Sequence, residues 1–505
     1  MNKQSRTTFL HLRSVILLLV CFPIWLLFSL LPVKAAASEA PTITVAIAKL
    51  TSDRFDPDKM EQALDDYIFS KMGFHIRLEF LPYTYSGQIM GSYLLSGDFP
   101  DVFLITQEGD YQLLRAENHL MPLNDLLSRY GQELTSFCGS QAMTSHVEND
   151  GECYAIPCIH TRAWSVGFEY RTDIAAQYGL DMNAVHDMDD LTQVFFSLKE
   201  QNPDIIPVLD AVWQVWDPLG DSLGVLMNLG KSDTIVNLYE TDEYAAICRI
   251  LGEWRQSGYI IDTDYVQLDV NSFVTLPEVF GKLADYNPSM QWMDEMEAEE
   301  PMASIALSDS VILSNAYFFN MWGIFSGTAY AVESMRFLNA LYSDPVIANL
   351  LAYGIEHENY EFSDEEKGLI HLSGPEGGNN TISWQIRNYL VGNQYLCYKW
   401  DNYPADIWQQ CMDFDRNAAL SEGYGFVFDQ NSVSAQVRAC QEIVNLYSPA
   451  LLYGLADSDM TLQEFRSALQ SAGIDDIIKE KQRQFDQWKA QKQTSEKEDP
   501  IHASP

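Results

Sequence analysis

The sequence has few basic residues. Its 505 residues include 31 Lys and Arg against 71 Asp and Glu, which gives a formal net charge of −40. Such a surface repels the phosphate backbone of nucleic acids and the anionic headgroups of lipids. We therefore expect no nucleic-acid partner, and the excess of acids is most simply explained by solubility.

The sequence also lacks the short motifs of common enzymes and nucleotide-binding proteins. It contains no G-x-S-x-G, H-E-x-x-H, P-loop or G-x-G-x-x-G pattern. The adjacent acids Asp189/Asp190 and Asp475/Asp476 are poor candidates for a glycosidase pair, because neighbours on a helix point in different directions. The segment 457–465 lacks the Gly and the bidentate Glu of a calcium loop. We assign no catalytic residue, no metal site and no cofactor.

The cysteine pattern excludes the usual zinc sites. There are eight Cys and no C-x-x-C pair, and no His stands at ligand spacing from any of them. Cys21 lies inside an apolar run, and Val20 occupies the place where a lipoprotein signal has a small residue. The other seven form no complete set of pairs. One disulfide among Cys138, Cys153 and Cys158 and buried free thiols are both open alternatives.

The N-terminal segment has the order of an export signal. Residues 1–13 are basic and contain no acid, Ser14–Val33 is almost wholly apolar, and small residues follow up to Ala37. This order predicts a signal peptide over 1–37 with cleavage near Ala37. Because the apolar run approaches the ~20 residues that span a bilayer, an uncleaved anchor is the alternative. In both cases the remainder of the chain is exported.

The rest of the sequence alternates strand-like and helical patterns. Thr42–Leu50 is typical of a strand, and Asp58–Gly73 has apolar residues at helical spacing with a Gly at its end. Further strands and helices follow to about residue 131, which predicts a parallel sheet covered by helices. Asp187 is expected to cap a helix that ends before Pro203.

The C-terminal third is expected to be mainly helical. Glu422–Phe428 is interpreted as a strand, residues 432–491 have a helical pattern, and the polar residues 491–505 are predicted to be a disordered tail.

Several stretches together resemble one protein family. These are "LLSGDFPDVFLI", "MPLNDLLSRYG", "ECYAIPCIHTRAWSVGFEYRTDIAAQYGLD" and "AYAVESMRFLNALYSDPVIANLLAYGIEHENYEF". Their order is similar to that of the extracellular solute-binding proteins of ABC importers, in the type-1 group that handles mostly sugars and oligosaccharides. "WQIRNYLVGNQYLCYKWDN" and the helical C-terminus resemble the lipoprotein-type subgroup with an extra C-terminal domain. The chain departs from this subgroup in lacking a clear lipoprotein signal.

The resemblance implies an α/β fold of the periplasmic-binding-protein-like type (type II), in which two lobes are joined by hinge segments. Each lobe is expected to be a mainly parallel sheet flanked by helices, followed by a C-terminal helical extension. The expected boundaries are 42–158 with 312–375 for the first lobe, 159–311 with 376–430 for the second, 431–490 for the helical extension and 491–505 for the tail.

The resemblance also implies a function. We expect a monomeric receptor that captures an oligosaccharide between its lobes and delivers it to the ABC permease in the membrane. A receptor for a peptide or polyamine is one alternative, and a secreted polysaccharide-degrading enzyme is another. A third is an anchored sensor or adhesion protein that has kept the binding fold.

Candidate ligand-binding residues follow from the chemistry of sugars. A sugar presents apolar faces to aromatic rings and hydroxyls to acids and amides, and ligands of parallel sheets lie beyond the carboxyl ends of strands. By contrast, we interpret Asp98 and Asp101, which flank Pro100, as residues that fix a turn. The candidates are Tyr83, Tyr85, Thr106, Gln107, Glu108, Trp164, Trp213, Trp216, Trp322, Trp384 and Asn393.

Overall fold

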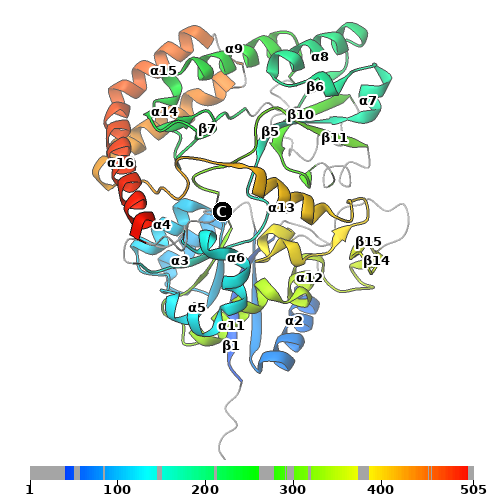
Figure 1. Ribbon diagram of the computed structural model, residues 1–505, viewed down its shortest axis with the longest axis vertical. Coiled ribbons are helices and arrows are strands. Elements are labelled where there is room, and N and C mark those ends of the chain that lie inside the picture. Colours follow the sequence, from blue (N-terminus) through cyan, green and yellow to red (C-terminus); the bar gives the residue numbers. More distant parts are fainter. Residues whose placement is uncertain are drawn as a thin grey trace, which may run out of the picture.

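The two lobes lie one above the other in a computed structural model of the chain, with a helical extension along one side (Figure 1). The structure describes residues 40–49, 57–82, 86–144, 151–209, 213–260, 278–290, 292, 301–316, 320–373, 386–452, 454–455 and 458–498. The predicted leader 1–37 and the candidates Tyr83, Tyr85 and Trp384 lie outside these residues.

The first lobe is built on a five-stranded sheet in the order β2-β1-β3-β13-β4. Strand β1 pairs in parallel with β2 and β3, whereas β13 runs antiparallel to both β3 and β4. The strands are β1 (Thr42–Lys49), β2 (His75–Pro82), β3 (Val102–Ile105), β4 (Ala155–Pro157) and β13 (Met321–Ile324). Its helices are α2 (Pro57–Met72), α3 (Ser86–Ser96), α4 (Glu108–Ala116), α5 (Asn124–Tyr130), α6 (Gln132–Thr144), α11 (Ala331–Ser343) and α12 (Pro345–Tyr353).

The predicted helix after the first strand is confirmed, and its sequence explains its packing. In α2, Met60, Leu64 and Ile68 recur at helical spacing and are buried against the sheet. The helix ends at Gly73, whose φ of 78° lies in the left-handed region that favours glycine. The chain then continues into β2, which pairs in parallel with β1, so β1, α2 and β2 form the expected βαβ unit.

Asp101, at the start of β3, is structural as predicted, but its side-chain bonds reach β1 and a distant loop and not the turn at Pro100. Its Oδ2 accepts a hydrogen bond from the Thr44 N–H at 2.8 Å, and its Oδ1 accepts one from the Thr328 hydroxyl. These bonds link β3 to β1 and to the loop before α11, so the carboxylate fixes the strand from both sides.

The second lobe has a four-stranded sheet in the order β11-β5-β10-β6. Only the β10–β6 pair is parallel, while β5 runs antiparallel to β10 and β11. The strands are β5 (Ser165–Arg171), β6 (Ile206–Val208), β10 (Val279–Tyr286) and β11 (Met302–Ala306), with helices α7 (Thr172–Gln177), α8 (Met188–Gln201) and α9 (Asp242–Gln256). As predicted, the Asp187 side chain caps α8 by accepting from the Asp190 N–H at 2.9 Å.

The two-lobe α/β fold class is therefore confirmed, and each sheet has one strand, β13 or β5, that runs opposite to the others. Each antiparallel strand follows a crossing between the lobes. Because the chain then enters the sheet from the opposite end, that strand runs against its neighbours. Strand β13 returns to the first lobe in this way, and β5 enters the second lobe directly after β4.

The segment after residue 386 packs differently from the predicted boundary, which placed 376–430 in the second lobe. The buried side chains of Ile386, Leu390, Trp408 and Cys411 belong to the core of the first lobe. This segment contains η6 (Asn388–Leu390), η7 (Gln394–Leu396), β16 (Lys399–Trp400) and α13 (Ile407–Asn417), and β16 pairs with β15 (Leu369–Leu372), which pairs with β14 (Tyr360–Asp364). Its apolar residues thus complete the first core, whereas Phe426 and Phe428 join the second.

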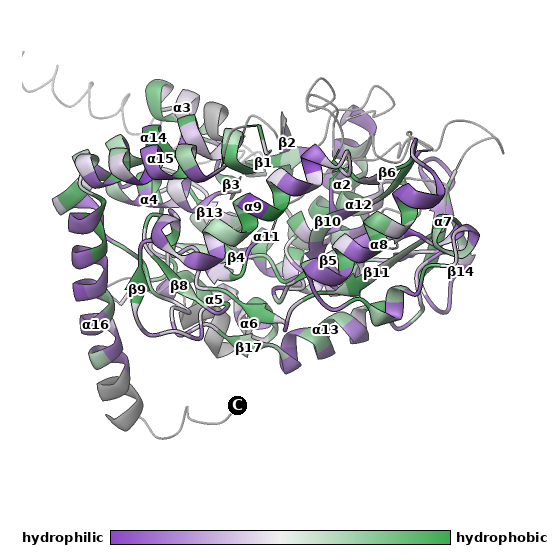
Figure 2. Cartoon of the chain, turned by 90° about the horizontal axis from the view of Figure 1, so that it is seen from above, coloured by the Kyte–Doolittle hydropathy of each residue, from purple (hydrophilic) through white to green (hydrophobic). Residues whose placement is uncertain are grey.

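The C-terminal extension consists of three helices packed on the second lobe. They are α14 (Ser434–Leu452), α15 (Ser458–Ala472) and α16 (Ile474–Glu498), and their apolar faces share one core with α9. Hydrophilic residues cover much of the visible surface of α16, as Figure 2 shows. A small sheet, β7 (Trp216–Asp217), β8 (Val225–Met227) and β9 (Ile235–Val236), lies against α16.

Two details of the sequence interpretation change, and one alternative that it left open, the state of the cysteines, is decided. Glu422–Phe428 is not a strand, because β17 (Ala419–Leu420) ends before it and the chain turns through Gly425 at φ 86°. The predicted tail begins too early, since α16 continues to Glu498. The seven cysteines after Cys21 are all buried free thiols.

The structure contains no membrane-spanning helix among the residues it describes, because none of its helices there is both long and apolar enough.

The core of the first lobe offers a test of the fold. Trp322 on β13 is fully buried, and its indole Nε1–H donates to the Leu390 carbonyl oxygen at 3.2 Å. Trp322→Ala should lower the free energy of unfolding by about 3–5 kcal/mol, because it leaves a large cavity. Urea denaturation followed by circular dichroism measures this loss. Leu95→Ala is the control, since Leu95 is 92% exposed and its replacement should change stability by less than about 0.5 kcal/mol.

Candidate functional site

A cleft of about 650 Å³ lies between the two lobes. Its walls come from the segment that joins β4 to β5, from the end of β10, from the segment between β12 (Val311–Ile312) and β13, and from η6 and η7. The lining residues are His160, Thr161, Arg162, Ala163, Trp164, Val166, Gln214, Pro218, Ser222, Ala284, Asp285, Asn287, Ser289, Met290, Leu313, Asn315, Ala316, Asn320, Tyr389 and Gln394.

The floor of the cleft is formed by segments that cross between the lobes. The Trp164 N–H donates to the Val311 carbonyl at 3.1 Å, and the Val311 N–H returns a bond of 2.9 Å to Trp164. The Trp164 side chain packs on the small cluster of Leu229, Val311 and Leu313 and remains partly exposed. Its position on paired crossing segments holds the indole at the boundary between the lobes.

Two aromatic side chains lie next to each other on the first-lobe side of the cleft. The ring centroids of His160 and Tyr389 are 6.1 Å apart in an edge-on arrangement. Nδ1 of His160 lies 2.8 Å from the Thr161 carbonyl oxygen, so this nitrogen is the donor and Nε2 is left as an acceptor. Burial lowers the pKa of His160 to about 4, which keeps the imidazole neutral at neutral pH.

The polar groups of the cleft are mostly amides and hydroxyls. Among the described lining residues, only Arg162 and Asp285 carry an ordinary charge. Burial raises the pKa of Asp285. Outside the lining, Asp415 of α13 accepts hydrogen bonds from the backbone N–H groups of Arg162 and Ala163 at 2.9 and 2.8 Å. This anchor fixes the chain beside the cleft.

One amide of the cleft is incompletely satisfied. The Oδ1 atom of Asn320 is buried and has no hydrogen-bond partner among the residues that the structure describes. Asn320 also has a φ of 58°, and its carbonyl accepts the Cys158 N–H at 2.9 Å. Because an unpaired buried acceptor is costly, a hydroxyl donor from a ligand would be stabilised at this position.

Of the candidates predicted from the sequence, the structure places Trp164 in the cleft. Gln394, which directly follows the candidate Asn393, also lines it. Asn393 itself is buried, where its side chain caps η7 by accepting from the Tyr395 N–H and donates to the Tyr342 carbonyl. Trp322 lies in the core of the first lobe.

The tryptophans of the second lobe also lie away from the lining. Trp216 on β7 is buried in the second core, and Trp213 is partly buried against it. A run of aromatic residues after a strand therefore does not distinguish a binding platform from packing residues, since both need large apolar surfaces.

The three candidate residues that follow β3 lie in different environments. Thr106 is buried and Gln107 is exposed. The Glu108 carboxylate is half-buried at the start of α4, and it faces Gly220 of the opposite lobe. Burial, followed by repulsion from Asp221, raises the pKa of Glu108 to about 7. Glu108 is thus an interlobe residue, although it does not belong to the described cleft lining.

Most lining residues were missed by the sequence interpretation. His160 and Arg162 lie in the segment that joins β4 to β5, and Asp285 and Asn287 lie at the end of β10. The position of polar residues at strand ends and crossovers was the available signal. The described residues contain no cluster of three or more His, Cys, Asp or Glu that could hold a metal ion.

Comparisons with solved structures find the same two-lobe architecture. The N-glycan transport solute binding protein (NgtS) from Streptococcus pneumoniae aligns with a TM-score of 0.79 and 20% identity over 88% of this chain and 98% of that one. The binding protein FusA of S. pneumoniae, solved with kestose, aligns with a TM-score of 0.63 and 16% identity over 89% of this chain and 100% of the other.

A curated relative agrees with these structures. A carbohydrate ABC transporter substrate-binding protein from Streptococcus pneumoniae serotype 4 is 23% identical over 457 residues, which is 86% of this chain and 89% of the relative. The chain therefore has the fold of the extracellular solute-binding proteins of ABC importers, and the resemblance seen in its motifs is confirmed. Within that class, residues 422–490 match the family described as a domain of unknown function, DUF3502.

The depressed pKa of His160 predicts a pH dependence of stability. The unfolded chain binds a proton at this residue below about pH 6.5, but the folded chain does so only near pH 4. Stability should therefore fall as the pH decreases through this window, by up to about 1.4 kcal/mol per pH unit from this residue. His160→Asn should flatten that part of the profile in urea titrations between pH 7 and 4.5. Exposed His371→Asn is the control, and an unchanged slope in the His160 variant would contradict the assignment.

Proposed function

We propose that this protein is the substrate-binding component of an ABC importer, and that it captures an oligosaccharide in the interlobe cleft. The observation that carries the proposal is the cleft itself, which opens between two lobes of the solute-binding fold and is lined by aromatic rings and uncharged polar groups. The fold match to transport binding proteins covers almost nine-tenths of the chain.

The lining suits the surface of a sugar. Trp164 and Tyr389 offer flat apolar faces, against which the C–H groups of a pyranose pack. The amides of Gln214, Asn315 and Asn320 offer both donors and acceptors to ring hydroxyls. A volume of about 650 Å³ lies within the usual range for ligand pockets. NgtS has been solved with Man1GlcNAc and Man5GlcNAc, which are ligands of this class.

The charges of the cleft favour a neutral ligand over a polyamine. The molecule as a whole is strongly acidic, yet the described lining residues balance one acid, Asp285, with one base, Arg162. A polycationic ligand needs several desolvated acids at close quarters. Hydrolysis of a glycoside by the usual mechanism needs two facing carboxylates, and Asp285 alone does not supply that pair.

The transport role follows from the architecture. Closure of two lobes about their crossing segments buries the ligand and creates a surface that differs between the open and closed forms. A membrane permease can bind the two forms differently through that surface. We therefore infer permease subunits as partners of a monomeric, extracellular receptor. Tyr83, Tyr85, Gln107 and Trp384 remain predicted contacts, which a bound structure would test.

Thermal unfolding with a panel of ligands tests the function. The panel contains Man1GlcNAc, Man5GlcNAc, kestose, spermidine and a tripeptide. A bound ligand at a hundred times its Kd adds about 2.7 kcal/mol to stability, so at least one oligosaccharide should raise the Tm saturably. Trp164→Ala should weaken that ligand about tenfold, because a stacking face is lost.

Phe196→Ala serves as the matched control, because Phe196 is an exposed aromatic of α8 outside the described lining. A response to spermidine or the peptide with none to any sugar would exclude the carbohydrate proposal. Chemically altered sugar recovered after incubation would favour the enzyme.

A further inference from the structure

A buried lysine of the domain of unknown function holds a loop of the ligand cleft. Lys481 on α16 is fully buried, and its ammonium pairs with the Asp221 carboxylate. The same group donates to the carbonyl oxygens of Leu219 at 3.5 Å and Gly224 at 3.2 Å. It also lies 4.9 Å from the ring centroid of Phe428. All these partners belong to other segments, so the ammonium joins α16 to the loop 217–224.

This loop needs such support because its backbone is unusual. Leu219 and Ser222 have φ values of 46° and 59°, a region that residues other than glycine rarely adopt. Pro218 and Ser222 of the same loop line the cleft. Bonds from one ammonium to two of the loop's carbonyl groups therefore stabilise a conformation that shapes the binding site.

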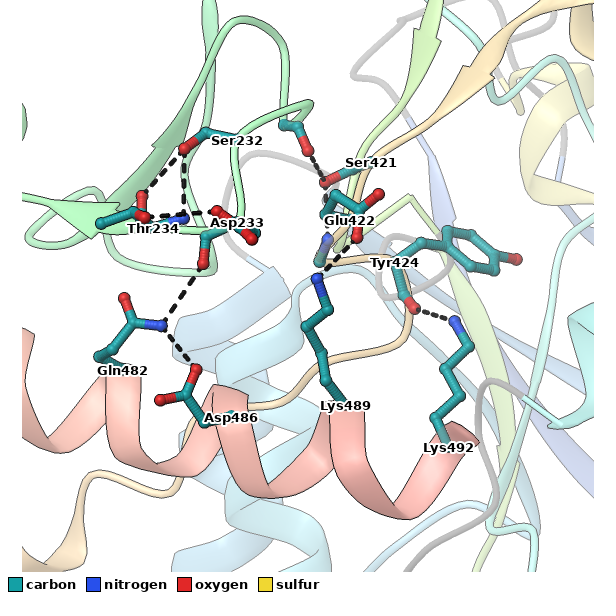
Figure 3. A network of polar contacts seen from close by, with 12 residues as sticks. Ser232, Asp233, Thr234, Ser421, Glu422, Tyr424, Gln482, Asp486, Lys489 and Lys492 are labelled. Carbon is teal, nitrogen blue, oxygen red and sulfur yellow. Dashed lines mark hydrogen bonds and ion pairs between the residues drawn. The ribbon is translucent and has the colours of Figure 1, made fainter. Parts of the chain in front are cut away.

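Neighbouring contacts of α16 reinforce the attachment, as Figure 3 shows. Lys489 pairs with Glu422 at 2.8 Å, and Gln482 donates to the Asp233 carbonyl at 3.4 Å. The Gln482 side chain also accepts from the Ile235 N–H of β9 at 2.7 Å. The helix is thus bound along its length to the segments around the loop.

The opposite lobe reaches the same loop through Glu108. A Cβ atom placed on Gly220 would lie 3.5 Å from a Glu108 carboxylate oxygen, so the two lobes are in contact here. On its own helix, Glu108 accepts from Gln112 at 3.1 Å. The charges that act on it from the second lobe and α16 are those of Asp217, Asp221 and Lys481.

We propose that Lys481 is a positioning residue for the cleft, and that with Asp221 it forms a latch that receives Glu108 when the lobes approach. The latch gives the C-terminal domain a role in transport, since α16 then supports the loop and the interlobe contact together. The role in ligand capture rests on the proposed function, but the latch itself does not require a ligand.

The latch links lobe closure to a proton. Glu108 has a pKa of about 7 in this arrangement, against about 4.3 for an ordinary glutamate in water. The closed arrangement of the lobes therefore binds the Glu108 proton more tightly than an open arrangement, in which water hydrates Glu108. As the pH rises between these two pKa values, the closed arrangement loses stability relative to the open one. Asp221 has a buried oxygen, Oδ2, with no hydrogen-bond partner among the described residues, and it belongs to the loop that Glu108 contacts at Gly220.

The distance between the lobes measures this coupling without a ligand. Spin labels on Phe69→Cys and Phe196→Cys, exposed positions of α2 and α8, report lobe separation by double electron–electron resonance. The native cysteines after Cys21 are buried, which limits unwanted labelling. The ratio of closed to open forms should fall by up to tenfold per pH unit between about pH 5 and 7 and level off above.

Substitutions at the latch separate it from a purely structural contact. Glu108→Gln should abolish the pH dependence, because the amide cannot titrate. Lys481→Met removes the nearby cation, so the midpoint should move to higher pH. Lys489→Met is the matched control on the same helix, and its midpoint should stay unchanged, because Lys489 pairs with Glu422 instead.

A wild-type ratio that does not change with pH, or a Glu108→Gln variant that keeps the change, would overturn the proposal. So would an unshifted midpoint in a folded Lys481→Met variant. If that variant fails to fold, Glu108→Gln alone decides the outcome. Failure of all sugars to bind would instead count against the proposed function and leave this distance measurement valid.

Discussion

The buried carboxylate of Asp217 joins the walls of the cleft, and much of the candidate site depends on it. Its oxygens accept hydrogen bonds from the N–H of Leu219 and from both the N–H and the hydroxyl of Ser314. Leu219 belongs to the loop of the second lobe, while Ser314 lies on the segment that returns to the first lobe. A buried charge is tolerated only when its bonds are complete, so this one fixes both segments in a defined register.

The C-terminal helices extend that constraint to the outside of the molecule. Lys481 supplies a second buried charge to the same loop, and it balances the acids around it. Burial lowers the pKa of Lys481, because the ammonium gives up hydration there. Replacing Lys481 would leave the Asp221 carboxylate without its partner cation, which costs far more than a surface ion pair contributes.

The two lobes depend on each other through segments that are distant in sequence. The first core includes Leu390, Trp408 and Cys411, and the second includes Phe426 and Phe485. A chain that crosses between lobes several times cannot fold one lobe from a continuous segment. This interleaving suits the proposed receptor, because the crossing segment of Trp164 both joins the lobes and lines the cleft between them.

Local patterns predicted a large part of the fold. The helix of Met60, Leu64 and Ile68 and the cap at Asp187 were predictable because each depends on near neighbours. The bonds of Asp101 to Thr44 and Thr328 depend on residues that are distant in the sequence, so the sequence could not show them. Glu422–Phe428 was misread as a strand, since Gly and aromatic residues also suit a turn over a core. The prediction that placed 376–430 in the second lobe was wrong for the buried residues between Ile386 and Cys411, because an apolar segment of this length can complete either lobe.

The sequence by itself determined the α/β class, the order of its elements and the family resemblance, because periodicity, caps and turns are local properties. Only the tertiary structure decided which polar residues meet. Trp164, a predicted ligand contact, lines the candidate cleft, but the lining residues His160, Asp285 and Tyr389 come from three separate segments. Glu108 and Lys481 are hundreds of residues apart in the chain, and their shared electrostatics arise only where the folded lobes meet.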